Sequence, residues 1–120
     1  MPRILVLDDE PLIAMMLEEW LTELGCEIIG PAYSLRAALD LLEREIPDGA
    51  ILDVSLRNDE NCYPVAKILL ERGIPFALVT GHDSVDLDAR YMPELVLTKP
   101  FDFAAVKAAL AKLIAQAGSE

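Results

Sequence analysis

The fold of this chain is decided by the stretch Gly49-Ala50-Ile51-Leu52-Asp53-Val54-Ser55-Leu56, a short apolar run that ends in a carboxylate. Such a run is long enough for a strand that is buried on both faces and too short for a typical helix. Strands of that kind belong to largely parallel sheets that are covered by helices. In open parallel sheets, ligands bind at the carboxyl ends of the strands. A lone Asp53 would usually do no more than open a surface loop, so its meaning depends on what else reaches the same edge.

Length and composition indicate one folded domain. The chain has 120 residues, 53% of them hydrophobic, and we expect residues 1–117 to form the domain and 118–120 a short tail. The formal net charge of -11 at pH 7 would repel phosphate backbones, so nucleic-acid binding is not expected. We expect a cytoplasmic protein, because the chain has no membrane-length apolar run and no signal-peptide pattern. Cys26 and Cys62 lack metal or redox spacing and are expected to be reduced thiols.

Five short apolar segments alternate with five helical segments along the chain. This alternation predicts an α/β fold, a flavodoxin-like doubly wound (βα)5 sandwich with a parallel five-stranded sheet. Right-handed crossovers leave few strand orders, and we predict the order 2-1-3-4-5. The predicted strands are 4–7, 27–30 (ended by Pro31), 49–53, 76–80 and 95–97; the predicted helices begin near Pro11, Ser34, Pro64, Asp83 and Asp102, and the last turns Phe103, Val106, Leu110, Leu113 and Ile114 inward.

Four of the predicted strands end in side chains that can take part in chemistry. Each has an ordinary explanation when it is considered alone: a helix cap, a strand-end hydroxyl or a surface charge. In the predicted strand order, however, all of them meet at one edge of the sheet, and that joint arrangement is hard to explain by chance. The residues are Asp8 and Asp9 after the first strand, Asp53 at the end of the third, Thr80 at the end of the fourth and Lys99 after the fifth.

Three crowded carboxylates predict a bound cation at this edge. They repel one another and raise one another's pKa unless positive charge intervenes. Lys99 supplies one charge, and a hard divalent ion with oxygen ligands, Mg²⁺, would supply the rest. The single histidine, His82, cannot build a zinc site. The expected cofactor is therefore Mg²⁺.

An ionised aspartate beside Mg²⁺ is competent for phosphoryl transfer. Its carboxylate can attack phosphorus to form an aspartyl-phosphate, and the remaining requirements are positioning and positive charge. The chain has no Gly-rich phosphate loop, so a nucleotide donor is not favoured. Three readings remain open: a signalling phosphoacceptor, a Mg²⁺-dependent phosphatase of small esters, and a binding surface that is never phosphorylated. The phosphatase reading usually requires an acid two residues after the nucleophile, where this chain has Ser55.

The chain resembles the receiver domain of two-component response regulators over essentially its whole length. Four segments carry the likeness: Leu7-Asp8-Asp9-Glu10, Leu52-Asp53-Val54-Ser55-Leu56, Val79-Thr80-Gly81 and Lys99-Pro100-Phe101. The resemblance implies that Asp53 accepts a phosphoryl group from the phosphohistidine of a sensor kinase. It also implies that Asp9, Asp53 and the Ser55 backbone carbonyl bind Mg²⁺, with Asp8 acting through a water. Thr80 and Lys99 would bind the phosphoryl oxygens, and the Lys99–Pro100 bond would be cis.

One position departs from the usual pattern. Most receivers have Tyr or Phe three residues before the lysine, where this chain has Val96, so the aromatic switch is absent. The run Pro75-Phe76-Ala77-Leu78-Val79-Thr80-Gly81 is similar to the branch called FATGUY, which also lacks the ring and often works with kinases of the HWE class. We therefore expect the polar segment 81–91 to be the mobile element that responds to phosphorylation. Ser55, His82 and Gly81 are expected to tune the lifetime of the phosphoryl group.

The expected output is a change in protein–protein contacts. No DNA-binding segment follows residue 117 in the sequence, so a phosphorylated chain would act by contact with another protein or by passing the phosphoryl group along a relay. The expected partners are a sensor histidine kinase and an unidentified downstream protein or phosphotransferase. Val96 makes the usual activated dimer harder to assume, and we expect a monomer or a weak dimer. By itself the chain would catalyse only its own phosphorylation and dephosphorylation.

Overall fold

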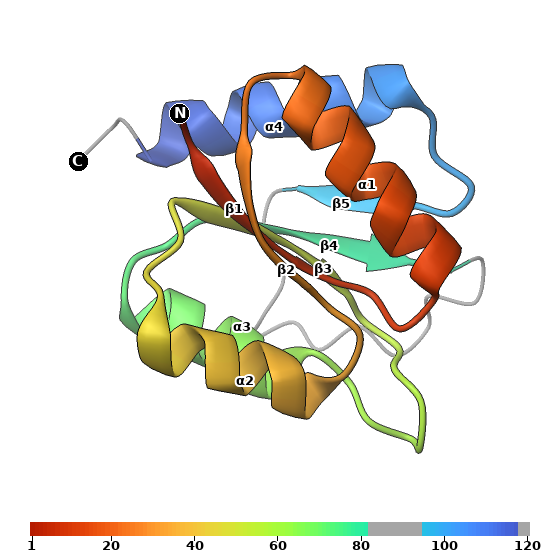
Figure 1. Ribbon diagram of the computed structural model, residues 1–120, viewed down its shortest axis with the longest axis vertical. Coiled ribbons are helices and arrows are strands. Elements are labelled where there is room, and N and C mark those ends of the chain that lie inside the picture. Colours follow the sequence, from red (N-terminus) through yellow and green to blue (C-terminus); the bar gives the residue numbers. More distant parts are fainter. Residues whose placement is uncertain (82–94, 118–120) are drawn as a thin grey trace.

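The computed structural model describes residues 1–81 and 95–117. Its parallel strands lie in the order β2-β1-β3-β4-β5, which confirms the predicted topology (Figure 1). The fourth predicted helix, which begins near Asp83, lies outside the described residues. The strands are β1 (Arg3–Leu7), β2 (Glu27–Ala32), β3 (Gly49–Asp53), β4 (Phe76–Thr80) and β5 (Val96–Thr98), and the helices are α1 (Pro11–Glu23), α2 (Leu35–Arg44), α3 (Tyr63–Glu71) and α4 (Phe103–Ala117).

The helices form two layers, one on each face of the sheet. Figure 1 shows α1 and α4 covering one face and α2 and α3 covering the other. Alternate residues of a strand point to opposite faces, and β1 accordingly contributes Leu5 and Leu7 to the core under α2 and α3, and Ile4 and Val6 to the core under α1 and α4. All five residues of the central strand β3 are buried. This complete burial explains why its sequence is continuously apolar up to Asp53.

Helix starts follow the sequence signals closely. The Ser34 Oγ accepts a hydrogen bond of 3.1 Å from the backbone N–H of Ala37 at the start of α2. An Asp102 carboxylate oxygen accepts one of 2.8 Å from the N–H of Ala105 at the start of α4. These caps satisfy backbone donors that the first helical turn leaves unpaired. No helix of the described ranges is both long enough and apolar enough to cross a membrane.

The second strand differs from its predicted end. Pro31 does not end β2, which continues to Ala32. Leu5 pairs with Ile29 and Leu7 with Ala32, so β2 carries one extra residue across from β1. The strand tolerates a proline because β2 lies at the edge of the sheet, where a missing N–H need not interrupt a central ladder. Gly30 has a φ of +97° at this bulge, and a Cβ there would lie 2.6 Å from the backbone nitrogen of Ala32, so the position requires glycine.

One predicted core residue of α4 is at the surface. Ile114 was expected to point inward, but 44% of its surface is exposed. The neighbouring Leu113 occupies the buried position instead, with 1% exposure. Because 3.6 residues make one turn, the stripe that passes through Val106 and Leu110 continues to Leu113 and places Ile114 at its margin.

Candidate functional site

The predicted site residues come together where the strands end. Register places Leu7 beside Leu52, and Thr80 beside Thr98, so the residues that follow these strands lie at one edge of the sheet. Asp8 follows β1, Asp53 ends β3 and Lys99 follows β5. In Figure 1 this is the edge toward which the strand arrows point. Parallel pairing therefore gathers groups that are separated by up to 91 positions, from Asp8 to Lys99.

A half-buried lysine ammonium lies among the carboxylates. The Lys99 Nζ lies 3.2 Å from Oδ2 of Asp53 and 3.6 Å from Oδ2 of Asp8. Asp8 is completely buried, and Asp53 and Thr80 are each 4% exposed. Carboxylate oxygens of Asp8, Asp9, Glu10 and Asp53 all lie within 4.8 Å of one another. The single positive charge of Lys99 therefore cannot balance the negative charges of these carboxylates.

Burial raises the pKa values of the two inner acids. The pKa of Asp53 rises to about 7, first because burial disfavours the carboxylate and second because the charge of Asp8 lies close to it. Burial is also the main cause of the raised pKa of Asp8. For Lys99, burial opposes the charged form, yet the hydrogen bond to Glu10 and the charges of Asp53 and Asp8 hold its pKa above the ordinary lysine value. The site therefore has an unmet demand for positive charge.

Backbone donors fix one oxygen of each inner acid. The N–H of Glu10 donates to Oδ1 of Asp8 at 2.9 Å, and the N–H of Ser55 donates to Oδ1 of Asp53 at 3.3 Å. The second oxygen of each carboxylate is left for other partners. Oδ2 of Asp8 is buried and has no hydrogen-bond partner among the described residues. A buried acceptor without a partner is costly, so this oxygen fits a site in which Asp8 holds a further ligand.

The donor set fits a magnesium ion. Hard divalent cations prefer carboxylate and carbonyl oxygens, and Mg²⁺ retains waters that can bridge to further acids. The side chains of Asp9 and Asp53 are close enough to share one ion, and Asp8 presents its unpartnered oxygen to the same cluster. Burial and the neighbouring Asp8 raise the pKa of Asp53, and positive charge placed beside the two carboxylates would oppose that rise. Receiver-type Mg²⁺ binding is thus compatible with the residues present.

Two charged residues contact the site without a predicted role. Glu10 accepts a hydrogen bond of 2.7 Å from the Lys99 Nζ. The Nε of Arg57 lies 3.6 Å from Oδ2 of Asp9. Glu10 stands in the Asp8-Asp9-Glu10 run, so its place next to the acidic pair was a usable signal. Arg57 stands in a polar loop with nothing to distinguish it, and only the three-dimensional path of that loop brings it to Asp9.

The remaining predicted positions lie around the rim. Ser55 is exposed, and Gly81 follows β4 with open space where a Cβ would be. Val96 lies on the edge strand β5 and is 38% exposed. The Lys99–Pro100 peptide bond is cis, as is that between Gly30 and Pro31. His82, and the segment 81–91 beyond Gly81, lie outside the described residues.

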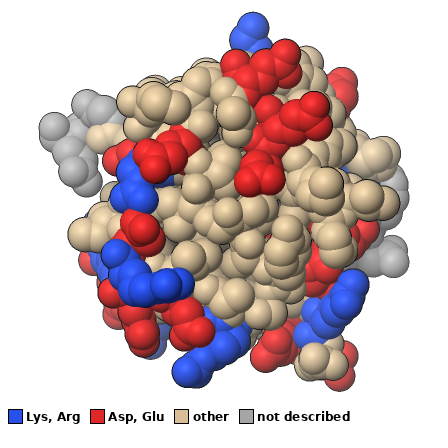
Figure 2. All heavy atoms as spheres, in the orientation of Figure 1, with Lys and Arg blue, Asp and Glu red and all other residues tan. Residues whose placement is uncertain are grey.

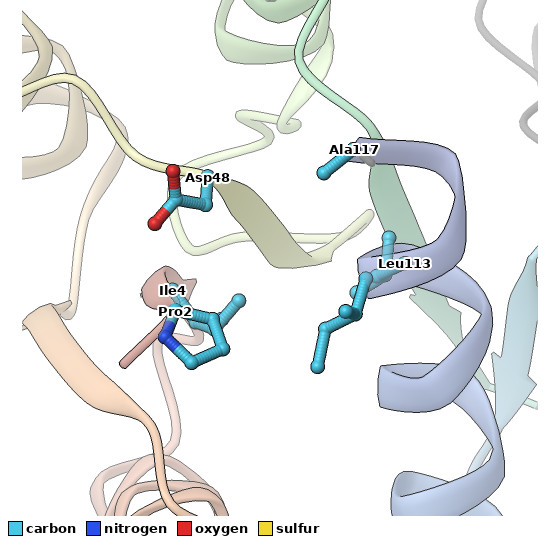
Figure 3. A pocket seen from close by; sticks show the side chains of 6 residues that line it. Pro2, Ile4, Asp48, Leu113 and Ala117 are labelled. Atoms are coloured by element: carbon cyan, nitrogen blue, oxygen red, sulfur yellow. The ribbon is translucent and has the colours of Figure 1, made fainter. Parts of the chain in front are cut away.

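A separate cavity occupies the opposite edge of the sheet. It has a volume of about 270 Å³ and lies between the start of β1 and the last turns of α4 (Figure 3). Figure 3 shows the carboxylate of Asp48 at one side of a lining that is otherwise apolar. None of the predicted site residues lines it, so this cavity is separate from the acidic cluster at the carboxyl edge. The lining residues are Pro2, Ile4, Asp48, Leu113, Ile114 and Ala117.

The surface is dominated by acidic groups. On the face drawn in Figure 2, acidic side chains cross the region of α1, and basic side chains lie mainly among acids in the lower half. The sequence of α1 contains Glu18, Glu19 and Glu23 and no lysine or arginine. This distribution agrees with the overall charge of -11 and offers no continuous basic surface on this face for nucleic acid.

Comparison with known families now decides the class of protein. The family model described as response regulator receiver domain matches residues 4–111. The chain is a response regulator receiver domain. Domains of this family serve as phosphoaccepting modules of two-component signalling rather than as enzymes of general metabolism, and they interact with histidine kinases. The match covers every predicted site residue, from Asp8 to Pro100.

Curated relatives of this receiver domain are longer proteins. It is 36% identical over 104 residues to the transcriptional regulatory protein PdtaR of Mycobacterium tuberculosis, covering 82% of the chain and 50% of PdtaR. It is 31% identical over 115 residues to the phyllosphere-induced regulator PhyR of Methylorubrum extorquens, covering 93% of the chain and 43% of PhyR. The receiver domain thus spans about half the length of the curated relatives it matches.

Solved structures of similar proteins share the whole fold. The solution structure of SdrG from Sphingomonas melonis superposes with a TM-score of 0.83 at 43% identity, covering 95% of this receiver domain and 97% of SdrG. A BeF3-activated conformation of SdrG gives a TM-score of 0.78 at 44% identity, covering 93% and 95% of the two chains. The receiver domain of PhyR from Erythrobacter litoralis gives 0.87 at 25% identity, covering 99% and 94%.

Proposed function

We propose that Asp53 accepts a phosphoryl group from the phosphohistidine of a sensor histidine kinase in a Mg²⁺-dependent transfer. One observation carries this proposal: Oδ2 of the buried Asp53 lies 3.2 Å from the Lys99 Nζ, inside a cluster of three further carboxylates. A carboxylate held in this way has a nucleophilic oxygen next to a fixed positive charge. Phosphoryl transfer mostly requires such positioning and charge stabilisation.

The transfer itself is a displacement at phosphorus. An Asp53 oxygen forms a new O–P bond while the P–N bond to the donor histidine breaks, and the electron pair of that bond stays on the imidazole nitrogen. The negative charge on the equatorial oxygens would be stabilised by the Lys99 ammonium and the Thr80 hydroxyl. The backbone N–H of Ser55 already donates to Oδ1 of Asp53, which leaves Oδ2 as the oxygen that faces Lys99. Oδ2 is therefore the proposed nucleophile.

Asp9, Asp53 and the backbone carbonyl of Ser55 would hold Mg²⁺ directly, and Asp8 would act through a water. A bound Mg²⁺ supplies positive charge that stabilises the phosphoryl oxygens and lowers the repulsion among the acids. Asp8 contributes through its buried, fixed position, because its Oδ1 is held by the Glu10 N–H. Ser55, Gly81 and His82 are the proposed residues that tune how quickly water removes the phosphoryl group.

We further propose that the phosphorylated chain acts through protein contacts or passes its phosphoryl group along a relay. Val96 in place of an aromatic residue means that the usual ring rotation cannot transmit the change. We propose that segment 81–91, which directly follows Thr80 in the sequence, transmits the change instead. The kinase partner is proposed to be of the HWE class, the setting cytoplasmic, and the protein a monomer or weak dimer. A relative with a BeF3-activated conformation supports a chemically triggered change in this group.

Incubation with Mg²⁺ and acetyl phosphate tests the proposal, with intact-mass spectrometry as the readout. We expect one added phosphoryl group per chain, lost in Asp53→Asn and in the presence of a chelator. Asp40→Asn is the matched control, because Asp40 lies in an exposed pair with Arg36 on α2. Continuous release of phosphate from small esters would instead indicate a phosphatase. A protein that remains unmodified in all conditions would indicate a binding surface only.

A further inference from the structure

The Lys99 ammonium donates hydrogen bonds to two carboxylates, those of Glu10 and Asp53, and makes a longer ion-pair contact with Asp8. The Lys99 Nζ lies 2.7 Å from Oε1 of Glu10, 3.2 Å from Oδ2 of Asp53 and 3.6 Å from Oδ2 of Asp8. A lysine ammonium has three N–H donors and no more. The shortest of the three contacts is the one to Glu10, which no sequence motif assigns to the chemistry. A phosphoryl oxygen that arrives at Lys99 therefore has to share the positive charge of this ammonium with the carboxylates that already contact it.

Glu10 is the acceptor that is free to move. Asp8 is completely buried, and its Oδ1 is held by a backbone N–H. Asp53 is buried and is the residue that would carry the phosphoryl group under the proposed function. The side chain of Glu10 is 57% exposed. The Glu10 carboxylate can therefore turn from Lys99 into water without becoming a buried charge that has no partner.

The position of Glu10 on its helix supports a role outside local structure. Glu10 is the N-cap residue of α1, where a polar side chain ordinarily accepts a hydrogen bond from the first helical turn. Here the side chain makes no cap hydrogen bond and is directed to Lys99, 89 residues away in the sequence. The helix start instead uses Pro11, which lacks an N–H to be satisfied. The observed orientation of the Glu10 side chain is therefore not required for α1 to begin.

We propose that Glu10 competes with the phosphoryl group for the Lys99 ammonium and so weakens phosphoryl binding at Asp53. The inference rests on the proposed function of Asp53 and makes Glu10 a positioning residue that acts through Lys99. In the unphosphorylated chain, Glu10 holds Lys99 at the mouth of the site. When a phosphoryl group binds, its oxygens take the donor that Glu10 accepted, and the exposed carboxylate turns to solvent. The negative charge of Glu10 also repels the incoming phosphoryl anion, and this repulsion likewise weakens phosphoryl binding.

Glu10→Gln keeps the size of the side chain and removes its charge. The test is binding of beryllofluoride, a phosphoryl mimic prepared from beryllium and fluoride, followed by amide NMR titration of the full chain. Mg²⁺ is held well above each variant's own dissociation constant for the metal, so that a change in metal affinity does not enter the result. We expect Glu10→Gln to bind beryllofluoride about two- to fivefold more tightly than the parent, the range for loss of one partly exposed ion pair. Glu19→Gln makes the same charge change on the outer part of α1 and should leave the affinity unchanged.

Unchanged or weaker beryllofluoride binding by Glu10→Gln would overturn the proposal, because a competitor for Lys99 must tighten binding when it is removed. Glu10→Ala provides a second variant with the same expected direction, and thermal unfolding of both variants checks that they are folded. If the parent and Glu19→Gln also fail to bind beryllofluoride, the proposed function of Asp53 is wrong, which is a different result. Tighter binding in both Glu10 variants, with no change in Glu19→Gln, supports the competition.

Discussion

Lys99 and Asp53 are 46 residues apart in the sequence, and the Lys99 Nζ donates a hydrogen bond of 3.2 Å to Oδ2 of Asp53. The pair joins the ends of β3 and β5, which are separated by β4 in the sheet. Only 21% of the Lys99 side chain and 6% of that of Asp53 are exposed. The contact is therefore partly withdrawn from water, where charge interactions are stronger than at the surface. We therefore expect the contact to influence both the stability of the domain and its proposed chemistry.

Lys99→Met should destabilise the metal-free domain at pH 8. Removal of the ammonium leaves Asp8 and Asp53 without their nearest cation, and an unpaired buried charge is costly. Because Lys99 is partly exposed, we expect a loss of about 1–3 kcal/mol rather than the larger cost of a fully buried pair. Urea denaturation measures it, and the loss should shrink when Asp53→Asn is also present. Lys67→Met on the exposed side of α3 is the control, and an equal loss there would contradict this explanation.

Stability of the metal-free domain should fall as the pH rises from about 4 to about 8. The pKa of Asp53 is raised to about 7 by burial and by Asp8, above its ordinary value of 3.8. A carboxyl with a raised pKa binds more protons in the folded state than in the unfolded state, so folding weakens as it ionises. The change is complete once the pH exceeds the folded pKa and amounts to about 2–4 kcal/mol. Urea denaturation at a series of pH values measures it.

Asp53→Asn should flatten this pH profile and make the domain more stable than the parent at pH 8. The amide keeps the shape of the side chain and removes the charge that Asp8 opposes. Asp40→Asn should leave the slope unchanged, because Asp40 is on the exposed surface of α2. A parent profile that is flat between pH 4 and pH 8, or a slope that survives in Asp53→Asn, would show that Asp53 is not the titrating group.

Much of the architecture was predictable because each element obeys a local rule. The apolar runs of β1, β3 and β4 are short and end in polar residues, and chirality of the crossovers leaves few strand orders. Pro31 and Ile114 were misread for different reasons. A proline ends a strand only where its missing N–H is needed, and β2 lies at an edge. Ile114 lies at the margin of an apolar stripe, where the neighbouring elements decide which residue is covered.

The residues that follow the strand ends were predictable from the sequence, and the contacts of Glu10 and Arg57 with the site were not. Short side chains such as Asp8 and Asp53 stay close to the backbone, so strand register alone brings them together. Lys99 was predicted too, because it follows β5 at the same edge. The side chains of Glu10 and Arg57 have several rotatable bonds, and their partners depend on packing that no sequence pattern encodes. The contact of Arg57 with Asp9 requires the path of the loop after β3, where Asn58 and Asp59 both have positive φ values. A sequence motif identifies the acids of the site, but it does not identify neighbouring charged residues such as Arg57.

Mg²⁺ should stabilise the domain strongly at pH 8 and weakly at pH 5. The ion requires ionised carboxylates, and Asp53 is largely protonated below its pKa of about 7. A ligand that binds only the folded state stabilises it by about 2.7 kcal/mol at a concentration of 100 times its dissociation constant. Thermal unfolding with and without Mg²⁺ measures the difference. Equal stabilisation at both pH values would contradict binding through Asp53.

Gly30→Ala should destabilise the domain, and Gly81→Ala should not. Gly30 has a φ of +97°, which side chains with a Cβ rarely adopt, and its added Cβ would lie 2.6 Å from the Ala32 nitrogen. The bulge at the edge of β2 must shift to relieve that contact, which we expect to cost about 1–3 kcal/mol. At Gly81 an added Cβ meets no atom of the described residues within 4 Å, so the same substitution should change the free energy of unfolding by less than about 0.5 kcal/mol. Urea denaturation of both variants compares them directly. Equal effects would show that the bulge at Gly30 adapts to a side chain and that backbone geometry does not fix the residue there.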